Sequence, residues 1–334
     1  MEDLIVQLTR RAEGKKPRLS PREWSEVLQD VFELRRFLPV VSVHLCLEIF
    51  CESLLSSEVD ENINLVRDIF DYKPADALFK ATKSATLYVL SVHKIGNVSL
   101  ASKEKIVAKA CEYYLDSSKD VDDPHLEVAA RCLNLVPEGA GSDHLQAYRD
   151  MLTALTMLVD FGVSILPIVV RHMTNYVPLV QKILHVDPAA YKSARKILRM
   201  IKLVGSLEKE KRPPLNEAPI LSTVADYALK ANNFDYCLSI CDLMMEKPSR
   251  EACQVALRLV NSQEFADHAA KVRLTSFCVN YCDGGDIEDM LMQRINLVDA
   301  DGTGLGELDY MYVPTGPPNV FQPGALSTTL PKQQ

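Results

Sequence analysis

The chain has 334 residues, of which 47% are hydrophobic and 25% charged, the balance of a soluble globular protein. Its formal net charge of −8 disfavours binding to nucleic acid or to an anionic membrane surface through bulk electrostatics. Thirteen glycines are few for this length and argue against many tight β-hairpins. The nine cysteines are scattered among apolar helical positions, which indicates reduced, cytosol-facing thiols.

The N-terminal sequence MEDLIVQLTRR contains neither a hydrophobic signal core nor a small-residue cleavage site, so we expect no signal peptide. Charges interrupt every apolar run well before the ~18 residues that a membrane-spanning helix needs. Residues 1–19 include the basic stretch GKKPR, and we expect this segment to be weakly ordered.

Helices are predicted in succession from Ser20 onward. Ser20-Pro21-Arg22-Glu23 is typical of a helix start, because Ser caps, Pro occupies the first helical position and Glu completes a capping box. The next helices are expected at about 41–55, near Asp60, after Pro74, after Gly96-Asn97 and from Asp123-Pro124. Further helices are expected from Pro178 and Pro188, and then at about 218–231, 234–246, 249–260, 264–282 and 286–297.

The central stretch, residues 143–171, is the strongest packing signal in the chain. Apolar residues recur at three- and four-residue spacing in two stripes, which leaves only a narrow polar strip on this helix. Such a helix is expected to be buried among others. Ser142 or Asp143 can cap its N-terminus, Gly162 suits a left-handed C-terminal cap, and Pro167 is expected to begin the next helix after a buried turn.

No run of period-two alternation suggests a β-strand. The pattern predicts an all-α fold, an elongated irregular α-solenoid or α-superhelix of antiparallel helices, over residues 20–297. A charged, Pro-rich loop at 206–219 is the expected protease-sensitive site within it. Residues 298–334 accumulate Gly, Pro, Thr and Asn, and we expect a disordered C-terminal tail.

Three stretches imitate metal chemistry without completing it. Asp299 begins a sequence like an EF-hand calcium loop, but its twelfth position is Tyr310 instead of the required bidentate Glu. The pairs Cys237/Cys241 and Cys278/Cys282 are four residues apart and lack the converging ligands of a zinc site, so buried free thiols are the preferred interpretation. The residues 122–127, DDPHLE, resemble an aspartate-rich metal motif incompletely, and Asp123 is better explained as a helix N-cap.

No HExxH pattern or Gly-rich phosphate loop occurs in the sequence. We therefore predict that the chain is not an enzyme and has no catalytic residues, metal site or cofactor. One surface feature remains, a basic stripe at helical spacing on the helix expected from Pro188, formed by Lys192, Arg195, Lys196, Arg199 and Lys202. The stripe could bind an acidic partner or a phosphate-bearing surface, or it could be only a solvated helix face.

Several segments, in order, resemble the neuroblastoma-amplified sequence family and its secretory-pathway tethering domain. They are LCLEIFCESLL (45–55), ENINL (61–65), FGVSILPIVVR (161–171), AAYKSARKIL (189–198), DYALKANNFDYCLSICDLMM (226–245) and MQRINL (292–297). The likeness covers about 21–297. Members of that family are much longer and carry an N-terminal β-propeller, so the resemblance implies a fragment or partial gene product.

The resemblance implies a non-enzymatic scaffold subunit of a vesicle-tethering complex in Golgi-to-ER retrograde transport. Its implied partners are tethering subunits of the zeste-white-ten and Rad-fifty-interacting type and the ER SNAREs, with no direct nucleic-acid binding. The implied location is cytoplasmic and peripheral to the ER membrane, through those partners. The alternative implied by the same family is a scaffold for nonsense-mediated mRNA decay factors at the ER.

Overall fold

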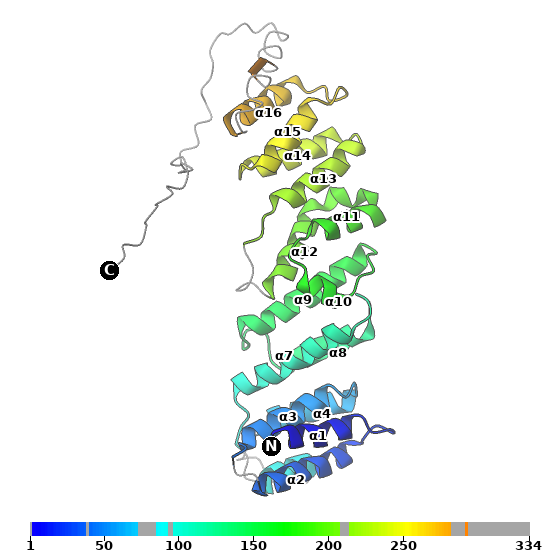
Figure 1. Ribbon diagram of the computed structural model, residues 1–334, viewed down its shortest axis with the longest axis vertical. Helices are drawn as coiled ribbons and strands as arrows, with labels where there is room; N and C mark the ends of the chain where they lie inside the picture. The colour runs from blue at the N-terminus through cyan, green and yellow to red at the C-terminus, as the bar shows by residue number, and fades with distance from the viewer. Residues whose placement is uncertain are drawn as a thin grey trace, which may run out of the picture.

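The structure, a computed structural model, describes residues 2–37, 40–72, 85–92, 96–207, 214–281 and 291–292. These residues form fifteen α-helices and the 3-10 helix η2, and no strand occurs among them. Figure 1 shows the helices stacked across one long axis, from α1 and α2 at one end to α16 at the other. The predicted all-α, solenoid-like fold is confirmed.

The first half of the stack contains α1 (Glu2–Glu13), α2 (Pro21–Phe37), α3 (Val43–Leu55), α4 (Asp60–Phe70), α6 (Ala85–Val92), α7 (Leu100–Ser117), α8 (Pro124–Leu133) and α9 (Asp143–Asp160). The second half contains α10 (Pro167–His172), α11 (Val177–Val186), η2 (Pro188–Ser193), α12 (Ala194–Ser206), α13 (Ala218–Lys230), α14 (Phe234–Met245), α15 (Arg250–Val260) and α16 (His268–Tyr281).

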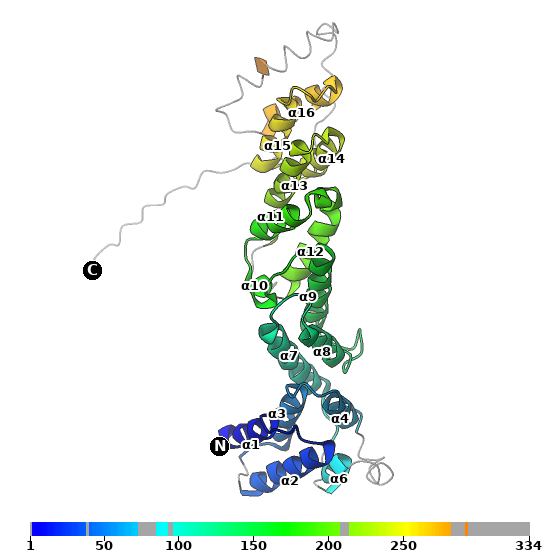
Figure 2. The ribbon, with the colours of Figure 1, turned by 90° about the vertical axis from the view of Figure 1, so that its right-hand side faces the viewer.

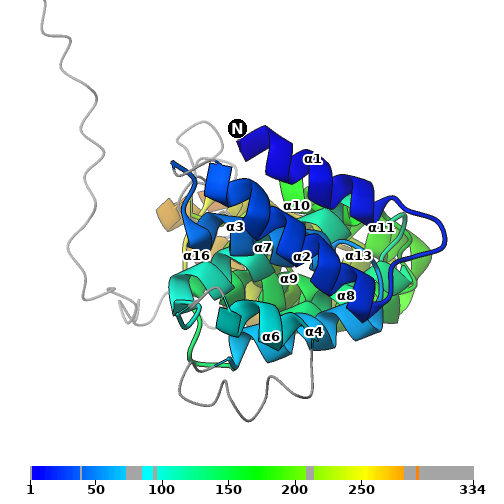
Figure 3. The same ribbon diagram turned by 90° about the horizontal axis from the view of Figure 1, so that it is seen from below.

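Helices pack mainly against helices close to them in sequence. The pairs α7–α8, α9–α12, α13–α14 and α15–α16 follow one another along the axis, and α3 joins the N-terminal helices to α7. The turned view in Figure 2 shows the same succession, and Figure 3 shows the helices overlapping when the stack is seen from its α2 end. An elongated stack of this kind exposes a large surface for its length.

Helix α9 is buried as its two apolar stripes predict. Leu145, Met151, Ala154 and Leu158 are fully buried, and Leu155 is nearly so. Gly162 has φ of +67°, and the N–H of Val163 donates to the Leu158 carbonyl at 3.0 Å, which closes the helix. Pro167 begins α10 as predicted.

Ser142 is the N-cap of α9, but its side chain makes no capping hydrogen bond. The backbone N–H of Ser142 donates instead to the Glu104 carboxylate at 2.8 Å, across the gap to α7.

The N-terminal segment differs from the expectation of weak order, because residues 2–13 form α1 against α2 and α3. Ile5, Thr9 and Ala12 are buried at i, i+4 and i+7, so they form one inward face. A threonine in the middle of that face hid its apolar periodicity. The Thr9 hydroxyl is satisfied locally, since it donates to the carbonyl of Ile5 at 3.2 Å.

The predicted capping box at Ser20 is confirmed. The Ser20 N–H donates to the Glu23 carboxylate at 2.8 Å, and the Glu23 N–H donates to the Ser20 hydroxyl at 3.4 Å. Other predictions lie outside the described residues: the helix after Pro74, most of 286–297, the middle of the 206–219 loop and the tail 298–334.

A set of polar contacts joins α3 to α7, and we call it the α3–α7 seam. Lys105 pairs with Glu48 at 2.7 Å, and Lys109 pairs with Glu52 at 2.8 Å. Both bases belong to α7 and both acids to α3. At the C-terminal end of α3, the buried Tyr114 hydroxyl donates to the Leu55 carbonyl.

Candidate functional site

The basic stripe predicted from the sequence is exposed at all five positions. Arg195, Lys196, Arg199 and Lys202 lie on α12, whereas Lys192 lies on η2. The prediction of one continuous α-helix from Pro188 is therefore corrected. The Asp187 carboxylate accepts from the Ala189 N–H at 2.9 Å, which caps the first turn of η2 before α12 begins.

The five cations of the stripe differ in their partners. Lys196 pairs with Asp160 at 2.9 Å and lies 5.0 Å from the centre of the Phe161 ring. Lys202 pairs with Glu217 at 2.8 Å. Arg195 and Arg199 have no ion-pair partner among the residues that the structure describes. Two neighbouring guanidinium groups one helical turn apart are thus open to an external anion.

The stripe belongs to a positively charged part of an acidic chain. Residues 161–206 contain seven lysines and arginines but one carboxylate, Asp187, which gives a net charge of +6 against −8 for the whole chain. Charge of one sign concentrated along a segment raises the local concentration of oppositely charged partners. The signal is visible in the sequence once charges are counted by segment.

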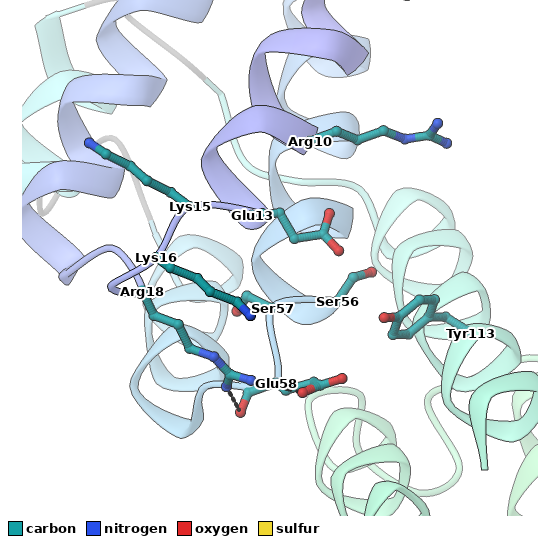
Figure 4. A pocket seen from close by; sticks show the side chains of 10 residues that line it. Arg10, Glu13, Lys15, Lys16, Arg18, Ser56, Ser57, Glu58 and Tyr113 are labelled. Atoms are coloured by element: carbon teal, nitrogen blue, oxygen red, sulfur yellow. Dashed lines mark hydrogen bonds and ion pairs between the residues drawn. The ribbon is translucent and has the colours of Figure 1, made fainter. Parts of the chain in front are cut away.

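A recess of about 550 Å³ lies between the α1–α2 loop, the α3–α4 turn and α7. Figure 4 shows Lys16 directed toward its centre and Lys15 directed away from it. Arg18 donates to the Glu58 carbonyl at 3.0 Å and to its carboxylate at 2.8 Å. Glu13 is half-buried nearby, and burial raises the pKa of its carboxyl, opposed by the charge of Arg10.

Glu58 joins three separate segments at this recess. It has φ of +60°, a left-handed conformation that a glycine would adopt at lower cost. Its side chain justifies that cost, because it binds Arg18 and also lies 3.2 Å from the Nε2 atom of His125 on α8. Acids and bases alternate around the recess, so it selects no single charge. We interpret it as a structural junction.

Buried thiols gather at the C-terminal end of the stack. Cys237, Cys241, Cys253 and Cys278 are all buried and free. The hydrogen bond from Cys237, together with burial, raises the pKa of the Cys241 thiol. The Cys278 thiol donates to the Cys253 carbonyl at 3.6 Å. Within the described ranges, no group of three or more His, Cys, Asp or Glu residues is arranged to hold a metal ion.

The remaining metal-like motifs divide into one confirmed assignment and one outside the structure. Asp123 is the N-cap of α8, and its carboxylate accepts from the His125 N–H at 2.9 Å, as predicted. The calcium-like loop from Asp299 to Tyr310, and Cys282, lie outside the described residues.

Among the described helices, none combines the length and apolarity needed to cross a membrane. The elongated stack and its charged surface define the class, an α-solenoid protein. The chain belongs to the Sec39 family of secretory pathway proteins, whose sequence model matches residues 6–273. The match begins inside α1 and ends inside α16, so it covers nearly all of the described stack. The family resemblance read from the sequence is confirmed.

Two curated relatives support this assignment. The chain is 26% identical over 314 residues to the human (Homo sapiens) NBAS subunit of NRZ tethering complex, covering 88% of the chain and 12% of that protein. It is 23% identical over 201 residues to MAG2-interacting protein 2 of Arabidopsis thaliana, covering 59% of the chain and 8% of that protein. The chain therefore spans about a tenth of the length of these relatives.

Proposed function

We propose that the chain is a non-enzymatic scaffold subunit of an ER-associated vesicle-tethering complex acting in Golgi-to-ER retrograde transport. Membership of a secretory pathway family and similarity to a tethering-complex subunit over 88% of the chain support this proposal. The proposed partners are tethering subunits of the zeste-white-ten and Rad-fifty-interacting type and ER SNAREs. Through them the chain would be cytoplasmic and peripheral to the ER membrane.

The elongated stack supports a structural mechanism. Each helix is fixed by its neighbours, so surfaces at α1 and at α16 are held apart at a set distance. The basic stripe on η2 and α12 is the proposed contact for an acidic partner. Unpaired guanidinium groups at Arg195 and Arg199 form charge-assisted hydrogen bonds to carboxylates without first breaking an internal ion pair.

Co-purification at native expression levels tests this proposal. The full chain is compared with the stripe variant Arg195→Glu/Arg199→Glu and with a matched control, Lys247→Glu/Arg250→Glu, at exposed positions of the α14–α15 connection. We expect the wild type and the control to recover tethering subunits and ER membrane proteins, and the stripe variant to lose at least one acidic partner. Recovery of messenger ribonucleoprotein factors in their place would favour the mRNA-decay alternative and overturn the transport role.

A further inference from the structure

A second recess, of about 460 Å³, lies between α11 and α13. Its walls include Gln181, Lys182 and His185 from α11, and Asp226, Tyr227 and Lys230 from α13. Figure 1 shows the two helices as neighbours in the middle of the stack. These positions are about 50 residues apart in sequence, so no local motif announces the site.

The two lysines of this recess are held by uncharged partners. Lys182 donates to the carbonyl of Ser164, and the ammonium group of Lys230 lies 5.0 Å from the centre of the Tyr227 ring. A carbonyl or an aromatic ring orients an ammonium group but does not neutralise its charge. Both positive charges therefore remain available to an anion.

The acids near the recess already have partners. Asp226 pairs with Arg258 on α15 at 3.1 Å. Asp120 also feels the charge of Lys182, but it lies outside the recess walls and accepts from the Ser164 hydroxyl and the Ile165 N–H. The recess thus contrasts with the mixed junction around Glu58.

The recess also lies next to the element that begins the basic stripe. Helix η2, which carries Lys192, packs against both α11 and α13, the two walls of the recess, and continues into α12. Both features fall within or beside the segment 161–206 with its net charge of +6. A chain of carboxylates leaving the recess would meet the stripe next.

We propose that the α11–α13 recess is an anchor site for a carboxylate side chain of an acidic partner segment, which continues along the basic stripe. Lys182, Lys230 and His185 supply donors to the carboxylate, and the Tyr227 hydroxyl and Gln181 amide supply neutral ones. This inference rests on the proposed function and names the chemistry of its partner.

The test uses the purified full chain and a fluorescent hexaglutamate peptide, with binding followed by anisotropy. We expect Lys182→Glu/Lys230→Glu to weaken binding at least about ten-fold, and Lys182→Arg/Lys230→Arg to retain it. The control Lys247→Glu/Arg250→Glu should stay within about two-fold of wild type. Because Lys182 also holds the α9–α10 loop, the single variant Lys230→Ala, whose ammonium lies over the Tyr227 ring, provides a second measurement with a thermal melt to verify folding.

Equal peptide binding by the wild type and both folded recess variants overturns the site. So does binding of phosphoinositide-containing vesicles, lost in the same variants, without binding of hexaglutamate. Tethering subunits that co-purify equally with wild type and recess variant also overturn the anchor role. Failure of the wild type to recover those subunits overturns the proposed function alone, because peptide binding by the purified chain does not depend on it.

Discussion

Two contacts between helices show different ways of holding the stack together. Between α9 and α12 the contact is apolar, and Ile197, Ile201 and Val204 of α12 are fully buried. The α3–α7 seam also buries apolar side chains, but it adds cross-helix ion pairs with all acids on α3 and all bases on α7. Burial is nearly insensitive to salt, whereas partly exposed ion pairs are screened. The comparison predicts that the two ends of the chain respond differently to salt and pH.

The largest expected effect tests the apolar contact. Leu155→Ala in α9 removes a side chain that is 1% exposed and leaves a cavity. We expect a loss of about 2–5 kcal/mol in the free energy of unfolding, measured by urea denaturation. Thr156→Ala, at the exposed neighbouring position, is the control. A loss below about 1 kcal/mol would show that α9 relaxes to fill the space and is not the rigid centre of the stack.

A smaller effect is expected for the buried hydrogen bond of the seam. Tyr114→Phe keeps the ring but leaves the Leu55 carbonyl without the hydroxyl donor. We expect destabilisation by about 1–3 kcal/mol, because a buried acceptor loses its partner. Urea denaturation measures it, and Tyr113→Phe, whose side chain is more exposed, is the matched control. An unchanged stability would mean that the carbonyl finds water on the open side of the seam.

The ion pairs of the seam should contribute less and depend on conditions. Lys105→Glu/Lys109→Glu places like charges opposite Glu48 and Glu52, and we expect a loss of about 1 kcal/mol that shrinks in high salt. A thermal melt at low and high salt measures it. A loss that is the same at both salt concentrations would assign the effect to packing of the lysine stems.

The pH dependence of the seam follows from Glu48. Burial acts to raise the pKa of Glu48, but hydrogen bonds from Lys105 and Ser102 and the charges of Lys105 and Lys109 together lower it. A lowered folded-state pKa gives stability that is present above the ordinary value of 4.5 and is lost as pH falls below it. Acid titration should therefore loosen the α3–α7 seam before the α9–α12 contact, as followed by amide hydrogen exchange. Simultaneous exposure of both contacts would contradict the distinction.

The smallest effect on stability is expected on the outer face of α12. Arg195→Glu/Arg199→Glu changes two exposed side chains without ion-pair partners among the described residues. Their reversal should alter the free energy of unfolding by no more than about 0.5 kcal/mol. The thermal melt of the same variant used for co-purification checks this. A larger loss would mean that loss of a partner cannot be separated from loss of the fold.

The sequence predicts the parts of this fold that depend on local patterns. The apolar stripes of α9, the Ser20 capping box, Gly162 and the proline-started helices all follow from short-range rules. Helix α1 escaped detection because Thr9 interrupts its buried face, and the break between η2 and α12 has no clear signal in composition. Long-range features were beyond reach: nothing in Ser56-Ser57-Glu58 indicates a left-handed residue bonded to Arg18 and His125.

The same limit applies to the candidate sites. The basic stripe was found because its residues share one helical period, and all five are exposed. The α11–α13 recess was not found, because it forms only when Lys182 and Lys230 are brought together by packing. Whether a lysine is paired with a carboxylate or with an aromatic ring is a tertiary property that composition does not encode.

The succession of contacts between nearby helices has a mechanical consequence. Joints arranged end to end along one axis act as springs in series, so each carries the full tension while their extensions add. The softest joint then determines how far the whole molecule stretches, and a joint stabilised partly by screened ion pairs softens as ionic strength rises. A pull applied along the long axis would therefore open the chain first at α3–α7, leaving the helices on either side folded.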